Sequence, residues 1–503
     1  MTERKERERI RTIITQDAEV DDQNSLRHFL LYTNEVELQG IIQTSSVFHW
    51  QGIRGAQAPA RETEGDPAFT AQSVAYDQPY RWPGTAWMDG VIDDYAAVYP
   101  NLRCHDSRYP GPATLRGLIR VGNIGYPGEM ETATQGSELI RRAMLDEDPR
   151  RLYLQVWGGT NTIARALYDI QTVYQAQGER AWEEIRAKLS DKVVITACGE
   201  QDTTYRDYIA QEWPQIPFVR CLQMGSYAYA WNRMPEGESK DTLRADFMKA
   251  NLLSGKGALL DGYATWADGK HYEGEEEGSQ FGSNPALLEH WWGAERGLGT
   301  YAPYDFISEG DSPTFFMLLD WGLRTTEDFS FGGFSGRYRR DETQRNEKGE
   351  PLNYWIPQQD VYTDRAGQSV ETESMWRYVA EIQNDFAARA DWCVTKSYAE
   401  AEHAPVLEVA EGTDLTASAG SAVRLHAAAK DPDGEAVTIS FRIYEEASEV
   451  RGAKVQTVSA EAEALLLIPE SAERGETLHV IVRAQKGGAH RLTHYQQVVV
   501  RVE

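Results

Sequence analysis

A short acidic stretch that directly follows an apolar run constrains the fold of this chain more than any other feature. Residues 11–16 read Arg-Thr-Ile-Ile-Thr-Gln, and the acids Asp17, Glu19, Asp21 and Asp22 come next. Apolar positions then recur at the three- and four-residue spacing of a helix face. This order predicts the first strand, loop and helix of an α/β sheet, with four carboxylates at the carboxyl end of the strand.

Carboxylates at that edge indicate a binding site. Ligands of open α/β sheets bind outside the carboxyl ends of the strands. Several carboxylates in one place repel one another unless a cation or a shared proton offsets their charge. A hard cation such as calcium offsets it well. Capping of the next helix is the alternative role, although three aspartates exceed what one cap requires.

Strand-like and helix-like segments continue to alternate along the chain, which predicts a largely parallel sheet with helices on both faces. Apolar runs predict strands at residues 36–44, 152–156, 193–196, 218–222 and 304–308. Helical spacing predicts helices at residues 88–99, 113–121, 137–145, 205–213, 243–253, 285–292, 314–319 and 372–394. Residues 326–366 lack a period and are expected to form loops.

The pattern changes after Lys396. Residues 397–405 read as a linker, and short alternating runs follow them. Asp431-Pro-Asp-Gly434 is a turn sequence between two of these runs, because Pro fixes φ and Gly accepts positive φ. About seven short strands in roughly a hundred residues are typical of an immunoglobulin-like β-sandwich. The sequence predicts an α/β domain at residues 1–396 and a β-sandwich domain at residues 405–503.

The composition and net charge of the chain limit the kinds of ligand that it is expected to bind. The chain has 51 Lys and Arg against 78 Asp and Glu, and its net charge of −27 would repel nucleic acid and anionic lipid. Neutral or cationic ligands are expected instead. No signal-like or membrane-spanning run is visible, so a soluble cytoplasmic protein is expected, or an exported one if a leader has been removed. The four cysteines are scattered and are expected to be free thiols, with disulfides as the alternative.

Motifs spread over nearly the whole chain resemble those of the nucleoside hydrolase superfamily. The resemblance is closest to the nucleoside hydrolase-like family known from cellulose-binding proteins. Besides the sandwich, the motifs are Thr15-Gln-Asp17-Ala-Glu-Val-Asp21-Asp22, Ser45-Ser46-Val-Phe-His49-Trp50, Val121-Gly-Asn123-Ile-Gly, Val156-Trp157-Gly-Gly-Thr-Asn161-Thr-Ile-Ala, Ser308-Glu309-Gly-Asp311-Ser-Pro and Gln383-Asn-Asp-Phe-Ala-Ala-Arg389.

The resemblance implies a calcium site and a reaction. Asp17 matches the aspartate that binds calcium and acts as general base, and Asp22 matches a bidentate calcium ligand. Trp157 matches the position whose backbone carbonyl binds the metal, and Asp311 matches a distant aspartate ligand. Asp21 matches the aspartate that contacts the sugar hydroxyls. The implied reaction is hydrolysis of a glycosidic or N-glycosidic bond to a pentofuranose-like sugar.

Two positions depart from the family pattern. Where nucleoside hydrolases carry a Pro-Gly pair, this chain has Ala18-Glu19, and Glu19 is an added ligand, a second acid or a solvated side chain. Gly310 stands where several nucleoside hydrolases have a histidine that protonates the leaving base. A furanoside or related glycoside is therefore expected ahead of a nucleoside.

Other polar and aromatic residues follow strand ends or lie in the family motifs, so they are candidates for contact with the sugar, with helix capping, tight turns or core packing as the alternatives. The substrate-binding candidates, beside Asp21, are Ser46, His49, Trp50, Asn161 and Glu309. Asn123, Gln201 and Arg337 are additional candidates. The glycine-rich run before Arg337 lacks a strand and a Walker lysine, so no phosphate site is expected there.

A non-catalytic role competes with hydrolysis. The chain could be a carbohydrate-binding protein that keeps the metal and diol cradle, with the sandwich as an accessory module. Retention of Asp17 favours the enzyme, because binding alone needs no base. The expected partner in either case is a small sugar, glycoside or nucleoside, with a homo-oligomer possible.

Overall fold

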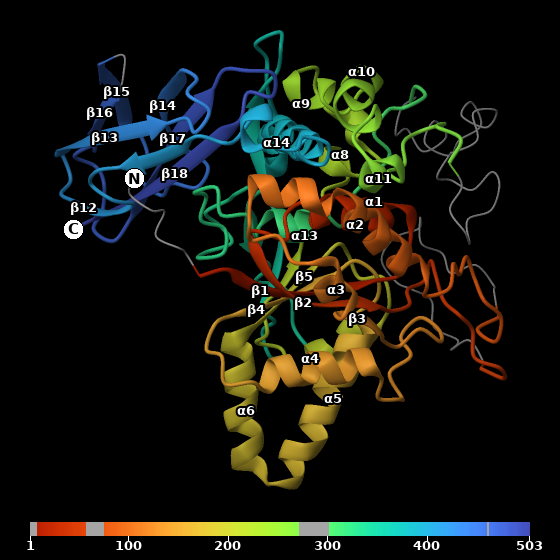
Figure 1. Cartoon of the computed structure of the whole chain (residues 1–503). Coiled ribbons are helices and arrows are strands. Elements are labelled where there is room, and N and C mark those ends of the chain that lie inside the picture. The colour runs from red at the N-terminus through yellow and green to blue at the C-terminus, as the bar shows by residue number, and fades with distance from the viewer. Residues whose placement is uncertain (1–7, 57–74, 271–300, 460–461) are drawn as a thin grey trace.

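The computed structural model describes residues 8–56, 75–270, 301–459 and 462–503. An eight-stranded sheet in the order β3-β2-β1-β4-β5-β6-β8-β7 lies at its centre (Figure 1). Its neighbours pair in parallel except β7 and β8. The strands are β1 (Ile10–Gln16), β2 (Val36–Gln43), β3 (Ile119–Val121), β4 (Leu152–Val156), β5 (Val193–Ala197), β6 (Phe218–Arg220), β7 (Tyr338–Arg340) and β8 (Tyr354–Pro357).

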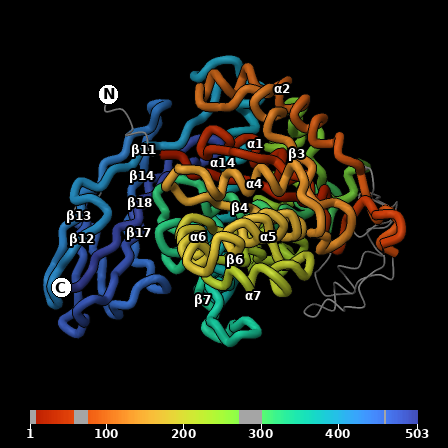
Figure 2. Tube along the Cα trace, turned by 90° about the horizontal axis from the view of Figure 1, so that it is seen from below, coloured from red at the N-terminus to blue at the C-terminus, as the bar shows by residue number. Residues whose placement is uncertain are grey.

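Helices cover both faces of this sheet, as predicted (Figures 1 and 2). On one face are α1 (Val20–Leu30), α2 (Trp87–His105), α13 (Pro313–Phe316) and α14 (Val379–Trp392). On the other are α4 (Gln135–Leu145), α5 (Asn161–Ala176), α6 (Glu179–Lys192), η2 (Tyr205–Ile209) and α7 (Ala210–Glu212). No helix in the described ranges combines the length and apolarity needed to cross a membrane.

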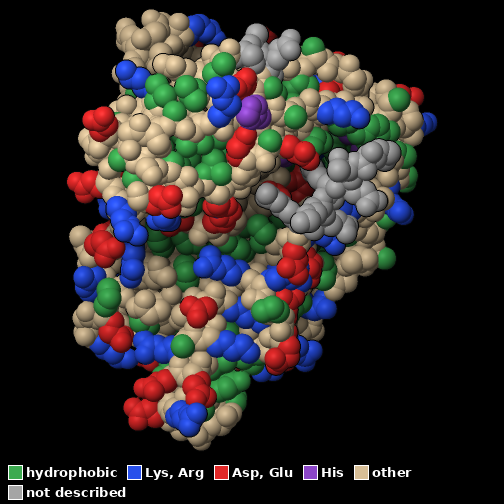
Figure 3. Space-filling model, turned by 90° about the vertical axis from the view of Figure 1, so that its left-hand side faces the viewer, with side chains coloured by type: hydrophobic (Ala, Val, Ile, Leu, Met, Phe, Trp, Pro, Cys, Tyr) green, Lys and Arg blue, Asp and Glu red, His purple; other side chains and the backbone are tan. Residues whose placement is uncertain are grey.

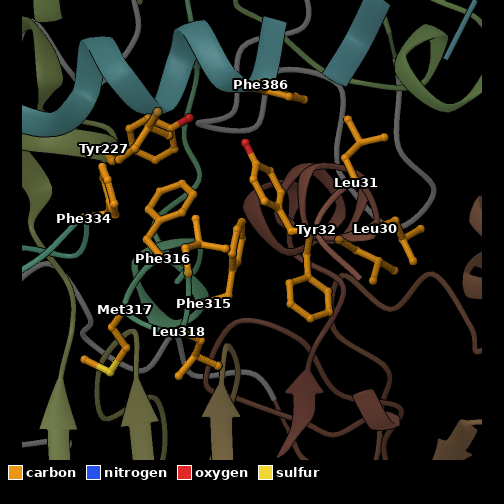
Figure 4. Close-up of a cluster of buried hydrophobic side chains, with 14 of the residues drawn as sticks. Leu30, Leu31, Tyr32, Tyr227, Phe315, Phe316, Met317, Leu318, Phe334 and Phe386 are labelled. Atoms are coloured by element: carbon orange, nitrogen blue, oxygen red, sulfur yellow. The ribbon is translucent and has the colours of Figure 1, made fainter. Parts of the chain in front are cut away.

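Alternation along β1 explains why the two faces have separate cores. Ile14 packs into the core under α1 and α14, and Ile13 packs into the core under α4 and α5. Figure 4 shows the first core, in which Phe315 and Phe316 lie between α14 and the sheet. Both faces of β1 are therefore buried, and its carboxyl end is held rigidly where the acidic loop begins.

Short helices connect β6 to the later strands and complete the α/β region. They are α8 (Met224–Tyr227), η3 (Trp231–Arg233), α9 (Glu238–Asp241), α10 (Ala245–Met248), η4 (Lys249–Leu253) and α11 (Ala258–Asp261), with α3 (Pro112–Arg116) lying before β3. The expected helix at 243–253 corresponds to α10 and η4. The helix expected at 285–292 lies outside the described residues.

Two expected elements near the sheet were wrong. Residues 119–121, expected to end a helix, form the edge strand β3, because they pair in parallel with the end of β2. Residues 304–308 do not form a strand, and only Phe306 makes an isolated bridge, to Thr265. The positive φ of Tyr304, +73°, interrupts the extended backbone that a strand requires.

Residues 326–394 contain more strand than expected. β7, β8 and β9 (Gln359–Thr363) lie in the segment expected to be loop. The single helix expected at 372–394 is divided into the end of β10 (Ser369–Glu373), the 3-10 turn η6 (Ser374–Tyr378) and α14. Its first residues instead pair across the β9–β10 hairpin.

The C-terminal residues form a β-sandwich of two four-stranded sheets, ordered β11-β13-β16-β15 and β12-β18-β17-β14. Residues of both sheets share one apolar core, which includes Leu425, Leu466, Val480 and Val498. The pairing is antiparallel except between β12 and β18. The strands are β11 (Val406–Val409), β12 (Asp414–Ala417), β13 (Ala422–Lys430), β14 (Val437–Ile443), β15 (Lys454–Ser459), β16 (Glu463–Leu467), β17 (Thr477–Lys486) and β18 (Thr493–Val502).

The sandwich packs directly on the α/β region. Tyr444, Ile481 and Tyr495 belong to the same buried cluster as the α1 and α14 side chains. The segment at Gly322 lies alongside the first residues of β18, where the Tyr495 amide donates to the Trp321 carbonyl at 2.9 Å. A Cβ at Gly322 would lie 1.7 Å from the Tyr495 carbonyl oxygen, so this contact requires glycine.

Candidate functional site

The acidic loop lies at the topological switch point of the sheet. β1 lies between β2 and β4, and the chain extends from it in one direction through β2 and β3 and in the other through β4, β5 and β6. The carboxyl ends of β1 and β4 therefore adjoin, and a Cβ at Gly158 would lie 2.8 Å from the Asp17 Cβ. Crevices at such points are the usual ligand sites of open α/β sheets.

Backbone geometry gathers the carboxylates of this loop. The Asp17 amide donates to Asp22 Oδ1 at 3.0 Å, and the Glu19 amide donates to Asp17 Oδ1 at 3.4 Å. Carboxylate oxygens of Glu19, Asp21 and Asp22 lie within 4.8 Å of one another. Asp21 and Asp22 lie in the first turn of α1, where the helix dipole stabilises negative charge.

Asp311 joins this cluster from a distant part of the chain. Burial is the main cause that raises the pKa of Asp311, and the charges of Asp21 and Asp17 raise it further. The pKa of Asp22 is raised well above 3.8, again by burial first and then by the charges of Asp17 and Asp311. These carboxylates thus lie close enough to disfavour one another's charged forms.

Several of their oxygens are buried without hydrogen-bond donors. Within the described part of the chain, Asp17 Oδ2, Asp22 Oδ2 and both Asp311 carboxylate oxygens accept no hydrogen bond from nitrogen or oxygen. Buried carboxylates in this state are costly unless a cation or ligand satisfies them. The donor set is rich in carboxylate oxygen, which fits a hard cation. The side chains whose ligand atoms lie within 4.8 Å of one another are Asp17, Glu19 and His49 in one group and Glu19, Asp21 and Asp22 in the other, and Asp311 belongs to neither group.

The Trp157 carbonyl, the expected fourth ligand, has a protein partner. Gln201 Nε2 donates to it at 2.6 Å, and the Gln201 carbonyl in turn accepts from the Val47 amide. One lone pair of the Trp157 oxygen is therefore used by the loop after β5. The indole of Trp157 is buried and donates to Thr314 Oγ1 at 2.7 Å, which ties β4 to the helix that follows Asp311.

The candidate substrate residues after β2 differ in their surroundings. The His49 ring and carboxylate oxygens of Asp17 and Glu19 lie within 4.8 Å of one another, so the structure brings His49 into the site. Trp50 packs against Tyr80 and donates to the Gln78 carbonyl. The Ser46 hydroxyl accepts from the Phe48 amide at 2.9 Å, which closes the local turn.

Asn161 and Asn123 are used in the framework that joins the strand ends. Asn161 Nδ2 donates to Ser45 Oγ and to the Asn123 carbonyl, both at 3.0 Å. Asn123 Nδ2 donates to Glu129 Oε1 at 2.9 Å. Both asparagines are fully buried. They hold the ends of β2, β3 and β4 together next to the acidic loop.

Glu309 supports the Asp311 segment. His28 Nδ1 lies 2.7 Å from Glu309 Oε2, and Tyr263 donates to the other carboxylate oxygen. Ser312 also contacts Oε2. Both oxygens of Glu309 thus have protein partners, and the contacts fix the loop that presents Asp311.

Arg337 lies away from the cluster. Its guanidinium pairs with Asp360, whose other oxygen accepts from the Tyr444 hydroxyl at 2.7 Å. Arg337 therefore belongs to the contact between the α/β region and the sandwich.

Two neighbours of the cluster were absent from the sequence-based candidates. The Ser308 hydroxyl lies 3.4 Å from Asp21 Oδ2. Burial and the charge of Asp311 raise the pKa of the Cys198 thiol, which places that thiol beside the cluster. Cys198 directly follows β5, so the strand-end rule could have identified it.

Comparison with known proteins identifies the family. Residues 11–338 match the family model described as "Cellulose-binding Sde182, nucleoside hydrolase-like domain". The chain belongs to this family. Residues 422–502 match its companion model, the C-terminal domain of cellulose-binding protein Sde0182. No protein with curated annotation matches the chain.

A solved structure shares the whole architecture of this Sde182 family member. It is described as a nucleoside hydrolase-related hypothetical protein from Saccharophagus degradans that is associated with carbohydrate metabolism. The two are 25% identical, with a TM-score of 0.69, over 99% of this chain and 100% of that one.

Two other solved structures are more distant. A plant nucleoside hydrolase is 10% identical over 76% of this chain and 100% of its own, and the type III effector XopQ is 11% identical over 77% and 95%. Both have a TM-score of 0.33.

Proposed function

We propose that this Sde182 family member is a calcium-dependent hydrolase of a glycosidic or N-glycosidic bond to a pentofuranose-like sugar. The observation that carries the proposal is the group of buried carboxylate oxygens without donors at the switch point, on Asp17, Asp22 and Asp311. Such oxygens are the ligands that calcium prefers. The description of the S. degradans structure as associated with carbohydrate metabolism supports a sugar as the substrate.

The residues have distinct roles in this proposal. Calcium, when bound, supplies positive charge that orients sugar hydroxyls and makes a nearby water more acidic. Asp17 Oδ2 is an acceptor without a protein donor and takes the proton of the attacking water. Asp21, at the first turn of α1, accepts hydrogen bonds from the sugar hydroxyls. His49, whose ring lies within 4.8 Å of carboxylate oxygens of Asp17 and Glu19, exchanges a proton with the leaving group in this proposal.

Hydrolysis assays on aryl furanosides and nucleosides, with calcium and after chelation, test the proposal. Asp17→Asn preserves the side-chain shape and should reduce turnover at least a hundredfold, since loss of a general base typically costs roughly 10²–10⁴-fold. Asp93→Asn, at an exposed surface ion pair, is the control and should keep full activity. Turnover that survives chelation and Asp17→Asn would contradict the proposal.

A second candidate function is carbohydrate binding without turnover. The family model is itself named for cellulose binding. Calcium-dependent sugar binding by the wild type, with no product formed from aryl furanosides or nucleosides, would establish this candidate and exclude hydrolysis of those substrates.

A further inference from the structure

A large groove lies between part of the sandwich and the α/β region, and none of its lining residues belongs to the acidic loop. Its volume is about 880 Å³, which is within the usual range of ligand pockets, roughly 300–1,000 Å³. One wall is formed by β14 and β17 of the sandwich, and the other by β9, η6 and the start of α14. In Figure 1 the sandwich lies beside α14, where these walls meet.

The strand pattern explains why polar side chains line the sandwich wall. Ser440 pairs with Arg483, and Arg483 pairs with Tyr495 across the adjacent strands. Neighbouring residues in each strand, such as Val482 and Val498, point into the sandwich core. Ser440, Arg483 and Tyr495 therefore lie on the outer face of this sheet and line the groove.

The groove is positively charged in a chain that is strongly negative. Five arginines and three glutamates line it, and Asp360 pairs with two of these arginines, so one positive charge is left in excess in a chain that carries −27. Figure 3 shows acidic and basic side chains interspersed over the face that carries the sandwich. The overall charge led us to expect neutral or cationic ligands, but the local charge of the groove attracts anions.

Two of the groove arginines lack a carboxylate partner. Arg337, Arg377 and Arg483 pair with Asp360, Glu446 and Glu381. Arg442, by contrast, lies over the Tyr444 ring at 5.1 Å, and Arg451 donates to the Glu445 backbone carbonyl. Neither forms an ion pair with a carboxylate in the described residues. Their guanidinium groups remain available to an anion.

Buried donors beside these arginines are also unused. The Tyr378 hydroxyl and Arg483 Nε are buried and have no hydrogen-bond partner among the described residues. Tyr378 is 1% exposed, and burial raises its pKa although the charges of Arg442 and Arg377 lower it in part. Arg377 and Arg442 lie over the same Tyr444 ring, at 4.9 Å and 5.1 Å, and both line the groove together with Tyr378.

We propose that this groove binds an acidic oligosaccharide through a carboxylate held by Arg442 beside Tyr378. Arginine presents a planar fork of donors that matches a carboxylate. Val361 and Tyr362, on the opposite wall, offer apolar and aromatic surface to a sugar ring. The volume of the groove, about 880 Å³, suits an oligomer better than a single small anion. The site contacts both parts of the chain, so its ligand bridges them.

Calorimetric titration of the full chain in the presence of a chelator tests this site. A short oligogalacturonate is the probe, with the matching cello-oligosaccharide and inorganic phosphate as comparisons. We expect the oligogalacturonate to bind with an affinity that falls as salt rises, and Arg442→Gln to weaken it by roughly tenfold or more. Arg180→Gln, on the exposed face of α6, is the matched control and should bind like the wild type.

The outcomes separate this proposal from the catalytic one. Equal binding of the neutral oligosaccharide, equal binding of phosphate, or unchanged affinity in Arg442→Gln would each overturn the acidic saccharide site. Arg451→Gln provides a second test on an exposed residue, should Arg442→Gln fold poorly, and an unchanged affinity there would count equally against the site. Asp17→Asn should bind oligogalacturonate normally, so failure of one site does not imply failure of the other.

Discussion

Asp22 is buried among other carboxylates, so its charge destabilises the fold in the absence of a cation. We predict that Asp22→Asn raises the stability of the calcium-free chain at neutral pH by roughly 0.5–2 kcal/mol, as is common when a functional conflict is removed. The asparagine Oδ1 can still accept from the Asp17 amide. Thermal unfolding with a chelator measures the gain, and calcium should no longer raise the Tm.

The stability difference between the wild type and Asp22→Asn should change with pH in a predictable direction. The pKa of Asp22 is raised above 3.8 in the folded chain, so the folded state holds this proton more tightly than the unfolded state does. The stability of the calcium-free wild type therefore falls as pH rises above 3.8 toward the folded pKa. The difference between wild type and Asp22→Asn should shrink on acidification. A difference that grows on acidification would be inconsistent with buried repulsion.

Ala18 gives the acidic loop a strained backbone. Its φ is +77°, a left-handed conformation that residues other than glycine rarely adopt. Proline cannot adopt this φ, so the Pro-Gly pair named in the comparison with nucleoside hydrolases could not take this conformation at position 18. This conformation precedes Glu19 and lets its carboxylate reach Asp21 and Asp22. The altered pair therefore adds an acid to the site.

Replacing Ala18 with glycine should relieve this strain. We predict that Ala18→Gly raises stability by about 1 kcal/mol, less the entropy that glycine gains in the unfolded chain. Denaturant unfolding of the calcium-free protein measures it, with Ala176→Gly at the end of α5 as a control that should not stabilise. A loss of stability in Ala18→Gly would show that the loop is not strained.

The element that presents Asp311 depends on a buried pair. His28, on α1, contacts Glu309 inside an aromatic cluster where its ring stacks on Phe386. Glu309→Gln should lower stability by roughly 1–3 kcal/mol, since its NH₂ group replaces one acceptor oxygen and leaves a buried hydrogen-bond donor unsatisfied. It should also weaken calcium binding, because Asp311 lies two residues away. Thermal unfolding and calcium titration check both effects, and Glu327→Gln on the exposed surface should alter neither.

Elements with a strong local signal were predictable from the sequence. The buried runs of β4 and β5 are continuous and apolar, and the sandwich strands alternate, so both were identified. The β9–β10 hairpin was missed, because the apolar spacing after Glu373 continues into α14 and hides the strand end. The positive φ at Tyr304 likewise has no signature in its neighbours.

Some parts of the candidate site could likewise be predicted from the sequence, and others could not. The acids of the loop lie close together in the sequence, directly after an apolar run, and this order alone indicated Asp17, Glu19, Asp21 and Asp22. The hydrogen bond between Gln201 and Trp157, and the pairing of Glu309 with His28, depend on contacts between distant strands and helices. Sequence spacing does not contain that information: Trp157 was expected to bind metal and Glu309 to contact substrate, Gln201 was an additional candidate, and His28 was not a candidate.

At the scale of the whole molecule, a histidine pair joins the two parts of the chain. His105 of α2 lies 3.1 Å from His403, which contacts Asp433 of the sandwich at 2.8 Å. Burial lowers the pKa of His105 to about 4, and the neighbouring His403 contributes. The unfolded chain, with an ordinary histidine pKa of 6.5, thus binds this proton more tightly than the folded chain.

Acidification should therefore weaken the junction. Stability falls as pH drops below 6.5 and continues to fall until about pH 4, the range between the two pKa values. We predict that His105→Gln, which does not titrate, shows a smaller fall in Tm over this range, by about 1–3 °C. Thermal scans at several pH values test this, with His426→Gln on the exposed strand β13 as control. Parallel curves for wild type and His105→Gln would contradict it.

The central claim is that residues far apart in the sequence form one calcium site at the switch point of the sheet. Calorimetric titration of chelator-treated protein with calcium, for wild type and Asp311→Asn, tests it most directly. The account predicts a single site in the wild type and at least a tenfold loss of affinity in Asp311→Asn, as expected for removal of a charged ligand. No calcium binding by the wild type, or unchanged binding by Asp311→Asn, would contradict it.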